Sequence, residues 1–335
     1  MLLITSADEY LGYCITAHLS KQESLRKGIR VLCSQKERCL GFARKGIDVR
    51  EVIADHPHQT SHAMRNIDLM ILILPKNENR VKECLSLCDT AIRSGVKSIL
   101  FLSTIGASCT DYDTFSDYQK IESKLLEVNI AWSILRLDWI QQHFHLWATQ
   151  IEEVRSLHFP FPNDIEFCPI DITDVCNVIQ KMVTEEKTGP FLFEISDSYS
   201  GQIFTLTGPE ATNGKKIVQM MSSATNFSQL KYQHTRLMDV RYYLESLSRN
   251  ISFYSRVKKE DSQRYHDELD ELEYRKKAYV APNYFQIQEF IDYFDWITKT
   301  SSSIPVDHVK VITNNDTRSL QDFFNENANS FKPRV

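Results

Sequence analysis

The chain has 335 residues, of which 42% are hydrophobic and 25% are charged, proportions typical of a soluble globular protein. Its 39 basic and 44 acidic residues give a formal net charge of −5, which argues against the basic field of a nucleic-acid-binding protein. No apolar run reaches the roughly 20 residues that span a bilayer, so we expect a cytoplasmic protein, with the nucleus as the alternative, and no direct contact with membranes or nucleic acid.

Short apolar runs alternate with stretches of helical periodicity through the first half of the chain. We expect strands at 2–4, 29–33, 47–53, 68–74, 96–103 and 131–135, and helices at 11–19, 36–45, 58–64, 77–94 and 116–128. Strands separated by helices form βαβ units, which build a parallel sheet covered on both faces. The predicted fold class is therefore α/β, a doubly wound Rossmann-like sheet in residues 1–155. Its strands at 2–4, 29–33, 71–74 and 99–102 are predicted to be buried parallel neighbours.

Residues 156–335 are predicted to form a smaller, mostly helical region interleaved with this core. Helices are expected at 171–185, 213–225 and 317–327, the last with Thr317 as its N-cap, and a strand at 203–207. Residues 258–277 mix charges of both signs along a helix, a pattern typical of a solvated face. A helix that binds a protein partner is the alternative for this stretch.

The eight cysteines include no CxxC pair. Cys84 and Cys88 lie four residues apart on a predicted helix and so share a face, where we expect thiols packed in the core rather than a zinc site or a redox pair. His143 and His145 have no partners at metal-ligand spacing. The HExxH, GxSxG and Walker patterns are absent from the sequence, and no metal site is expected.

Five segments carry a resemblance to a known family. They are residues 94–107, 129–136, 169–175, 204–210 and 317–324, which match in order the fifth strand with its loop, the sixth strand, the start of a later helix, a strand with its turn, and a closing helix. Together they resemble the NmrA-like family of atypical short-chain dehydrogenases over nearly the whole chain. The resemblance implies a Rossmann fold, NADP(H) or NAD(H) as cofactor, and either oxidoreductase or regulatory activity.

The loop after the first strand departs from this family. The family's glycine-rich turn has the form TGATGxxG, whereas the stretch from Thr5 to Gly12 reads TSADEYLG and keeps only the last glycine. The first two glycines permit the tight turn and the close approach of the backbone to the pyrophosphate. Asp8 and Glu9 add negative charge where a helix N-terminus attracts phosphate, although they also favour the helix dipole. We expect the dinucleotide to bind weakly or not at all.

The resemblance places the cofactor at the carboxyl ends of the strands. Ser34 stands where the family often has an arginine that reads a 2′-phosphate, and Lys36 and Arg38 are either its substitutes or ordinary surface charges. The expected cofactor-binding residues are Thr5, Ser6, Tyr10, Leu11, Gly12, Ser34, Lys36, Arg38, Pro75 and Ser103. The expected substrate cleft is lined by Thr104, Ile105, Trp139 and His143.

Many relatives use a Tyr-xxx-Lys pair, in which the lysine helps the tyrosine to transfer its proton. The two corresponding positions hold Thr114 and Tyr118. A shifted pair of Tyr118, or Tyr112, with Lys120 requires that the helix begin after Tyr118, because residues two apart on a regular helix do not face each other. The alternative is an exposed helix start with a surface lysine.

Three functions follow from these observations. The joint loss of the loop glycines and of the Tyr-xxx-Lys pair favours a regulatory or redox-sensor protein with a degenerate NAD(P)-binding cleft and little or no dehydrogenase turnover. The second function is an active NADPH-dependent reductase that uses Tyr118 or Tyr112 with Lys120. The third is a structural interaction module that binds a protein partner through the cleft or through residues 258–277. Fold analogy does not choose among them, because this fold hosts many functions.

Overall fold

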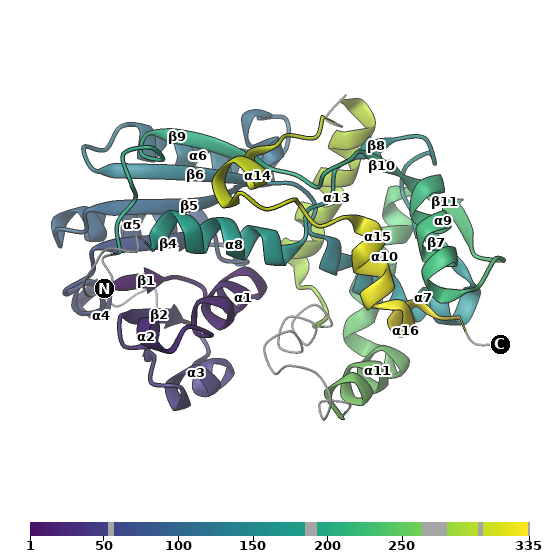
Figure 1. Cartoon of the computed structure of the whole chain (residues 1–335), viewed down its shortest axis with the longest axis horizontal. Helices are drawn as coiled ribbons and strands as arrows, with labels where there is room; N and C mark the ends of the chain where they lie inside the picture. Colours follow the sequence, from purple (N-terminus) through teal and green to yellow (C-terminus); the bar gives the residue numbers. More distant parts are fainter. Residues whose placement is uncertain (53–56, 185–192, 263–279, 301–303, 334–335) are drawn as a thin grey trace. The chain divides into compact units, whose positions relative to one another are not determined.

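The computed structural model describes residues 1–52, 57–184, 193–262, 280–300 and 304–333 (Figure 1). The described chain divides into two compact units. The first comprises Met1–Leu137 and Cys176–Thr205, and the second comprises Asp138–Val175 and Leu206–Val335. Of the charged stretch predicted at 258–277, residues 263–277 lie outside the described residues.

The first unit is built on a seven-stranded sheet. Its strands are β1 (Leu2–Ile4), β2 (Ile29–Cys33), β3 (Asp48–Glu51), β4 (Leu69–Ile73), β5 (Ser98–Thr104), β6 (Ala131–Leu137) and β9 (Gln202–Leu206). They lie in the order β3-β2-β1-β4-β5-β6-β9, and all neighbours from β3 to β6 are parallel. The order reverses between β1 and β4, the point at which doubly wound folds bind ligands beyond the carboxyl ends of their strands.

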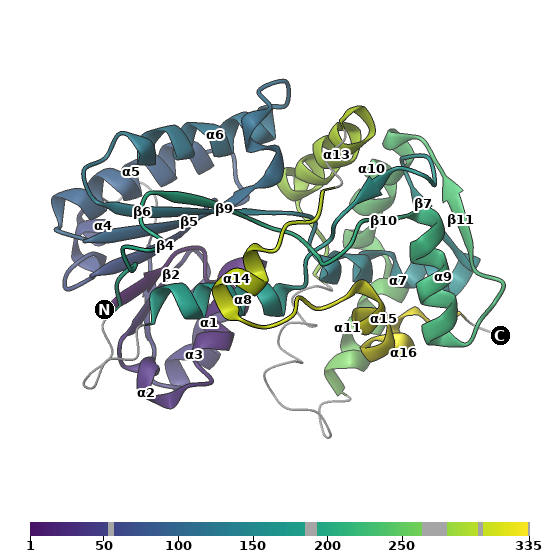
Figure 2. The same ribbon diagram turned by 45° about the horizontal axis from the view of Figure 1, so that its top comes forward.

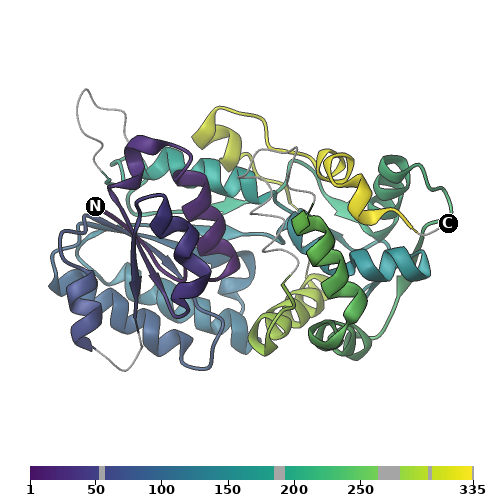
Figure 3. The ribbon, with the colours of Figure 1, turned by 90° about the horizontal axis from the view of Figure 1, so that it is seen from below.

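Continuous apolar runs form β1 and β4, and β2 is apolar except for Arg30 and is likewise buried. Every residue of β1, β2 and β4 is buried, as a sheet covered by helices on both faces requires. One face is covered by α4 (Pro57–Ala63), α5 (Arg80–Arg93) and α6 (Asp113–Leu126), and the other by α1 (Tyr10–Leu19), α2 (Glu23–Arg26), α3 (Leu40–Arg44) and the part of α8 (Ile172–Val183) from Cys176 onward (Figures 2 and 3). Short 3-10 turns, η1 (Lys36–Cys39) and η2 (Ile105–Ser108), follow β2 and β5.

The predicted fold class is confirmed. The four strands expected to be parallel neighbours are β2, β1, β4 and β5, which lie side by side in this order. Cys84 and Cys88 are fully buried between α5 and the sheet, so the expectation of core-facing thiols is confirmed. Several predicted bounds are wrong by two or three residues. The strand expected at 47–53 is limited to the four residues of β3, which pair with β2. The helix expected from 116 begins at Asp113, and the helix expected from 77 begins at Arg80.

The second unit is mostly helical, as predicted. Its elements are η3 (Gln141–Trp147), α7 (Ala148–Val154), β7 (Ser156–Phe159), β8 (Glu166–Phe167), the start of α8, β10 (Thr212–Asn213), α9 (Gly214–Thr225), β11 (Lys231–His234), α10 (Leu237–Ser246), η4 (Leu247–Arg249), α11 (Ile251–Ser262), α13 (Tyr284–Lys299), α14 (His308–Thr313), α15 (Leu320–Glu326) and α16 (Ala328–Phe331). Strands β10 and β8 pair antiparallel, and β11 and β7 pair parallel. Among the described residues, no helix is long and apolar enough to cross a membrane.

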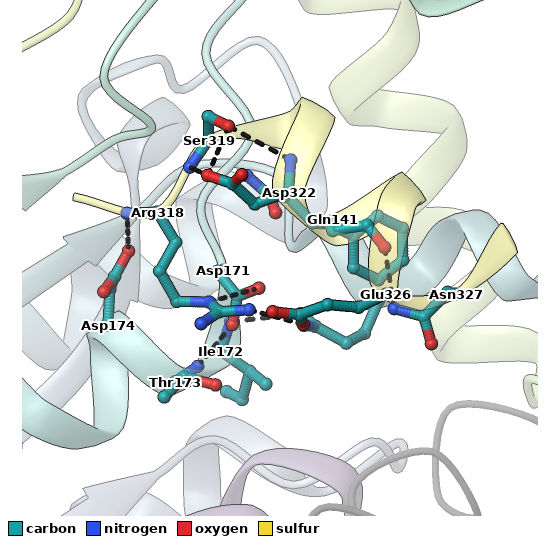
Figure 4. Close-up of polar contacts among 12 residues, drawn as sticks. Gln141, Asp171, Ile172, Thr173, Asp174, Arg318, Ser319, Asp322, Glu326 and Asn327 are labelled. Carbon is teal, nitrogen blue, oxygen red and sulfur yellow. Dashed lines mark hydrogen bonds and ion pairs between the residues drawn. The ribbon is translucent and has the colours of Figure 1, made fainter. Parts of the chain in front are cut away.

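The start of α15 is fixed by a capping box and by an arginine (Figure 4). The Ser319 hydroxyl accepts from the backbone N–H of Asp322, whose carboxylate accepts from the backbone N–H of Ser319. The predicted N-cap, Thr317, is therefore wrong, because the reciprocal pair forms two residues later. The Arg318 backbone N–H donates to Asp174 at the start of α8 over 2.8 Å, and its guanidinium Nε lies 3.4 Å from the Asp171 carboxylate.

Candidate functional site

The loop between β1 and α1 holds one non-glycine residue in a left-handed backbone conformation, which glycine favours. Ser6, at the position of the family's first glycine, has a φ of +51°. This left-handed conformation costs a non-glycine residue about 1 to 2 kcal/mol. Gly12 is needed because a Cβ at this position would lie 2.3 Å from the carbonyl oxygen of Ser6. The first turn of α1 therefore packs directly on the loop, as the last glycine of dinucleotide-binding loops allows.

Asp8 links this loop to the loop after β2. Its side chain is buried, with 3% of the residue exposed. Its Oδ2 accepts hydrogen bonds from the backbone N–H of Ser34 (3.1 Å), the Ser34 hydroxyl (2.7 Å) and the backbone N–H of Gln35 (2.8 Å). The Arg38 guanidinium donates to the main-chain oxygen of Asp8 over 3.2 Å. The Asp8 carboxylate thus points to the end of β2 and away from α1.

Glu9 links the same loop to the loop after β4. Its Oε1 accepts from the backbone N–H of Lys76 over 2.9 Å, and its side chain does not cap α1, of which it is the N-cap residue. The hydroxyl of Ser6 donates to the Ile73 carbonyl at the end of β4 over 3.2 Å. The sequence suggested that Asp8 and Glu9 face the helix N-terminus. The structure instead turns both carboxylates toward the ends of the neighbouring strands.

The expected cofactor residues surround the reversal in strand order. Thr5 exchanges hydrogen bonds with Ile73 through its hydroxyl. Tyr10 and Leu11 form the first turn of α1, and Pro75, half-buried, follows β4. Lys36 is exposed in η1. Within the described residues, no group of three or more His, Cys, Asp or Glu side chains is arranged to hold a metal ion.

Tyr118 pairs with a lysine that sequence reasoning missed. The Lys76 ammonium donates to the Tyr118 hydroxyl over 2.9 Å and lies 5.5 Å from the centre of its ring. Lys120 does not approach Tyr118, because α6 begins at Asp113 and both residues are helical. Lys120 instead pairs with Asp117 at 3.0 Å, with 54% of its side chain exposed. The available signal for Lys76 was its place just beyond the carboxyl end of β4, next to the reversal in strand order.

A buried carboxylate lies four residues after Tyr118, at the position that the lysine occupies in a Tyr-xxx-Lys pair. This residue, Glu122, is 4% exposed. It accepts from the Ser103 hydroxyl over 2.5 Å and forms two hydrogen bonds with Arg136, of 3.0 and 2.6 Å. The guanidinium of Arg136 compensates the negative charge of Glu122. Ser103 is itself 3% exposed, and its hydroxyl donates to Glu122.

The residues expected to line a substrate cleft are distributed over both units. Thr104 and Ile105 are half-buried at the end of β5 and the start of η2. Trp139, 4% exposed, belongs to the second unit, where its ring lies 5.3 Å from that of His143 and 4.8 Å from that of Phe290. Trp139 and His143 are thus part of the aromatic core of that unit.

No known family matches the chain in sequence, and no curated protein does. Solved structures nevertheless share its fold. Triphenylmethane reductase from Citrobacter sp., complexed with NADP(H), is 13% identical, with 98% of this chain and 100% of that one covered and a TM-score of 0.71. NADPH-dependent quinone oxidoreductase from Escherichia coli, complexed with NADPH, is 16% identical, with 98% and 99% covered and a TM-score of 0.70.

A regulator shares the fold as well. NmrA, a negative transcriptional regulator in complex with NAD, is 12% identical, with 97% of this chain and 94% of that one covered and a TM-score of 0.60. The chain therefore shares the Rossmann-like fold of these three proteins, as the sequence resemblance implied. Because the same fold occurs in two reductases and in a regulator, the function has to be argued from the site.

Proposed function

We propose that the protein binds a nicotinamide dinucleotide weakly at the strand-order reversal of its first unit, and that it acts as a regulator or redox sensor with little or no dehydrogenase turnover. One observation carries the lack of turnover. The Ser103 hydroxyl donates to Glu122, and both Ser103 and Tyr118 are buried, at 3% and 8% exposure. A proton donor must reach its substrate directly or through one water.

The backbone of the first loop supports the binding half of the proposal. Ser6 adopts a left-handed conformation that glycine favours, and Gly12 allows the close packing of loop and helix. Because Asp8 and Glu9 are bonded to neighbouring loops, the positive end of the α1 dipole remains available to a pyrophosphate. We expect weak binding because both carboxylates belong to the same loop, and like unit charges repel by roughly 1 to 4 kcal/mol at a separation of about 4 Å.

An active reductase is the second candidate, and the Lys76–Tyr118 contact favours it. A cation beside a phenol stabilises the phenolate that remains once the proton has been given up. In this alternative Tyr118 is the proton donor and Lys76, rather than Lys120, is the cation that assists it. Tyr118 is only 8% exposed. Movement of α6 or of the loop after β4 would therefore first have to expose its hydroxyl group.

A regulator also needs a partner. We propose that a protein partner binds through the charged stretch 258–277, most of which lies outside the described residues, and we keep the predicted substrate cleft as the alternative surface. Deletion of residues 263–277 would abolish partner binding in the first case and preserve it in the second, and it should leave dinucleotide affinity unchanged in both. Loss of dinucleotide binding in this deletion would contradict the separation of the two roles.

A turnover assay with a matched variant separates the two candidates. The purified 335-residue chain is incubated with NADH or NADPH and a panel of quinones and carbonyl compounds, and oxidation of the dinucleotide is followed. The control is the double variant Tyr118→Phe, Lys76→Met, which retains the loop after β1. The regulator predicts equal, background rates for both proteins. A wild-type rate that exceeds that of the variant by about 10²-fold, as loss of a general acid and its cation typically produces, would establish the reductase instead.

A further inference from the structure

The loop after β2 holds an acidic group that comes from elsewhere in the chain. In doubly wound folds, the end of the second strand, about twenty residues after the last loop glycine, reads the adenosine ribose. A carboxylate there accepts from the 2′-hydroxyl of NAD, whereas a cation there receives the 2′-phosphate of NADP. The residue after β2 in this chain is Ser34, which is neither. Asp8 supplies the carboxylate from the loop after β1.

We propose that Asp8 makes the dinucleotide site selective for NAD(H) over NADP(H), an inference that rests on the dinucleotide binding proposed above. Asp8 acts first by occupying donors. The backbone N–H groups of Ser34 and Gln35 and the Ser34 hydroxyl all donate to its Oδ2, at 3.1, 2.8 and 2.7 Å. These groups are the ones that a 2′-phosphate at the end of β2 would need as ligands.

Asp8 acts secondly through its charge. Asp8 as a residue is 3% exposed, so solvent screens its charge poorly. A 2′-phosphate bound at Ser34 would therefore have either to displace a buried carboxylate that accepts three hydrogen bonds or to place its own negative charge beside it. A 2′-hydroxyl carries no charge and meets neither obstacle.

The cations of the same loop act in the opposite direction. Lys36 and Arg38 would attract a 2′-phosphate, and Arg38 already lies beside the first loop, where it donates to the Asp8 main-chain oxygen over 3.2 Å. Both side chains belong to exposed residues of η1, and Glu37 between them is exposed as well. Exposed charges interact weakly because water and salt screen them. The buried carboxylate therefore determines the selectivity.

Calorimetric titration with NADH and with NADPH, at one ionic strength, tests this inference. The proteins compared are the wild type, Asp8→Asn and Glu37→Gln. Asparagine keeps an oxygen for the amides of Ser34 and Gln35 but removes the charge. Glu37→Gln makes the same charge change at an exposed position of the same loop. Thermal unfolding of each variant establishes that it is folded.

The wild type is expected to bind NADH at least about 10-fold tighter than NADPH, a ratio equivalent to about 1.4 kcal/mol. Asp8→Asn should reduce this ratio by about 10-fold, mainly by strengthening NADPH, whereas Glu37→Gln should leave it within about two-fold. Equal or tighter binding of NADPH by the wild type, or an unchanged ratio in a folded Asp8→Asn variant, would overturn the inference and leave the proposed function intact. Absence of binding of both dinucleotides would overturn both. If Asp8→Asn does not fold, the wild-type ratio alone decides.

Discussion

The Lys76 ammonium group donates a hydrogen bond of 2.9 Å to the Tyr118 hydroxyl, and it thereby joins the loop after β4 to helix α6. Tyr118 is part of the core between α5, α6 and the sheet, and its ring lies 6.2 Å from that of Phe101. A buried phenol needs a hydrogen-bonding partner. The lysine therefore has a structural role in the first unit whether or not Tyr118 ever transfers a proton.

Replacement of Lys76 by methionine is expected to lower the free energy of unfolding by about 1 to 3 kcal/mol, because the buried Tyr118 hydroxyl loses the donor it has at 2.9 Å. Lys120→Met is the matched control. Its exposed pair with Asp117 predicts a change within about 0.5 kcal/mol. Urea unfolding of the two variants measures the difference, and equal effects would contradict the role given to Lys76.

Two glycines provide a sharper test of the first loop. Gly12→Ala places a methyl group 2.3 Å from the Ser6 carbonyl and is expected to destabilise the protein by about 1 to 3 kcal/mol. Nothing lies within 4 Å of a Cβ at Gly41, which is in α3. Gly41→Ala should therefore stabilise the protein by up to about 1 kcal/mol. Thermal unfolding measures both effects. A Gly12→Ala variant as stable as the wild type would contradict the close approach of α1 to the loop.

Arg318 is predicted to hold the C-terminal helices of the second unit. Its guanidinium contacts Asp171, which is 2% exposed, and pairs with Glu326 over 2.5 Å (Figure 4). Arg318→Met should cost about 1 to 3 kcal/mol, since it leaves the buried Asp171 carboxylate without its cation. Arg236→Met breaks an exposed pair with Asp239 and should change stability by less than about 0.5 kcal/mol. Comparable losses in the two variants would contradict this role.

The second unit should be more stable in mild acid than at neutral pH. Burial raises the pKa of Asp138 from 3.8 to about 7, although hydrogen bonds from Tyr293, Trp139 and Cys168 act to lower it. Because the folded-state pKa lies above the unfolded one, the folded state binds the proton more tightly. The stabilisation from this proton is complete below about pH 4 and is lost as the pH rises to about 7.

Asp138→Asn is expected to flatten this part of the stability profile, because an amide does not titrate. Chemical unfolding across the range from pH 4 to pH 8, followed by tryptophan fluorescence, measures the slope. Asp239→Asn is the control, because it changes an exposed carboxylate of the same unit. A slope that Asp138→Asn leaves unchanged would show that another group is responsible.

Most of the strands were predictable because short, largely apolar runs separated by helices have few alternatives to a parallel sheet, whereas the order of the strands in the sheet was not predicted. The first two strands and the helix of the first βαβ unit were placed within a residue of their observed bounds. The start of α6 was not predictable, because its N-cap, Tyr112, forms no side-chain cap. Near the C-terminus, both Thr317 and Ser319 are residue types that cap helices. Ser319 is the N-cap because the carboxylate of Asp322 completes a capping box with it.

The polar contacts of the site were not predictable for a different reason. The sequence shows that Asp8 and Glu9 precede a helix, and this favours an interaction with its N-terminus. Where the carboxylates point depends on backbone amides that folding brings near them, at Gln35 and at Lys76. The contact between Lys76 and Tyr118 likewise joins residues 42 positions apart. Pairings of this kind follow from the packing of the sheet rather than from spacing along the chain.

Calorimetric titration of the wild type and of the Ser6→Gly, Glu9→Gly variant with NADH tests the central proposal most directly. Glycine at position 6 relieves a φ of +51°, and glycine at position 9 removes a negative charge from the loop. We predict saturable binding of one dinucleotide per chain by the wild type, with a Kd no tighter than about 10 μM, or about −7 kcal/mol, and tighter binding by the variant. A submicromolar wild-type Kd, or no binding by either protein, would contradict a weak dinucleotide site at this loop.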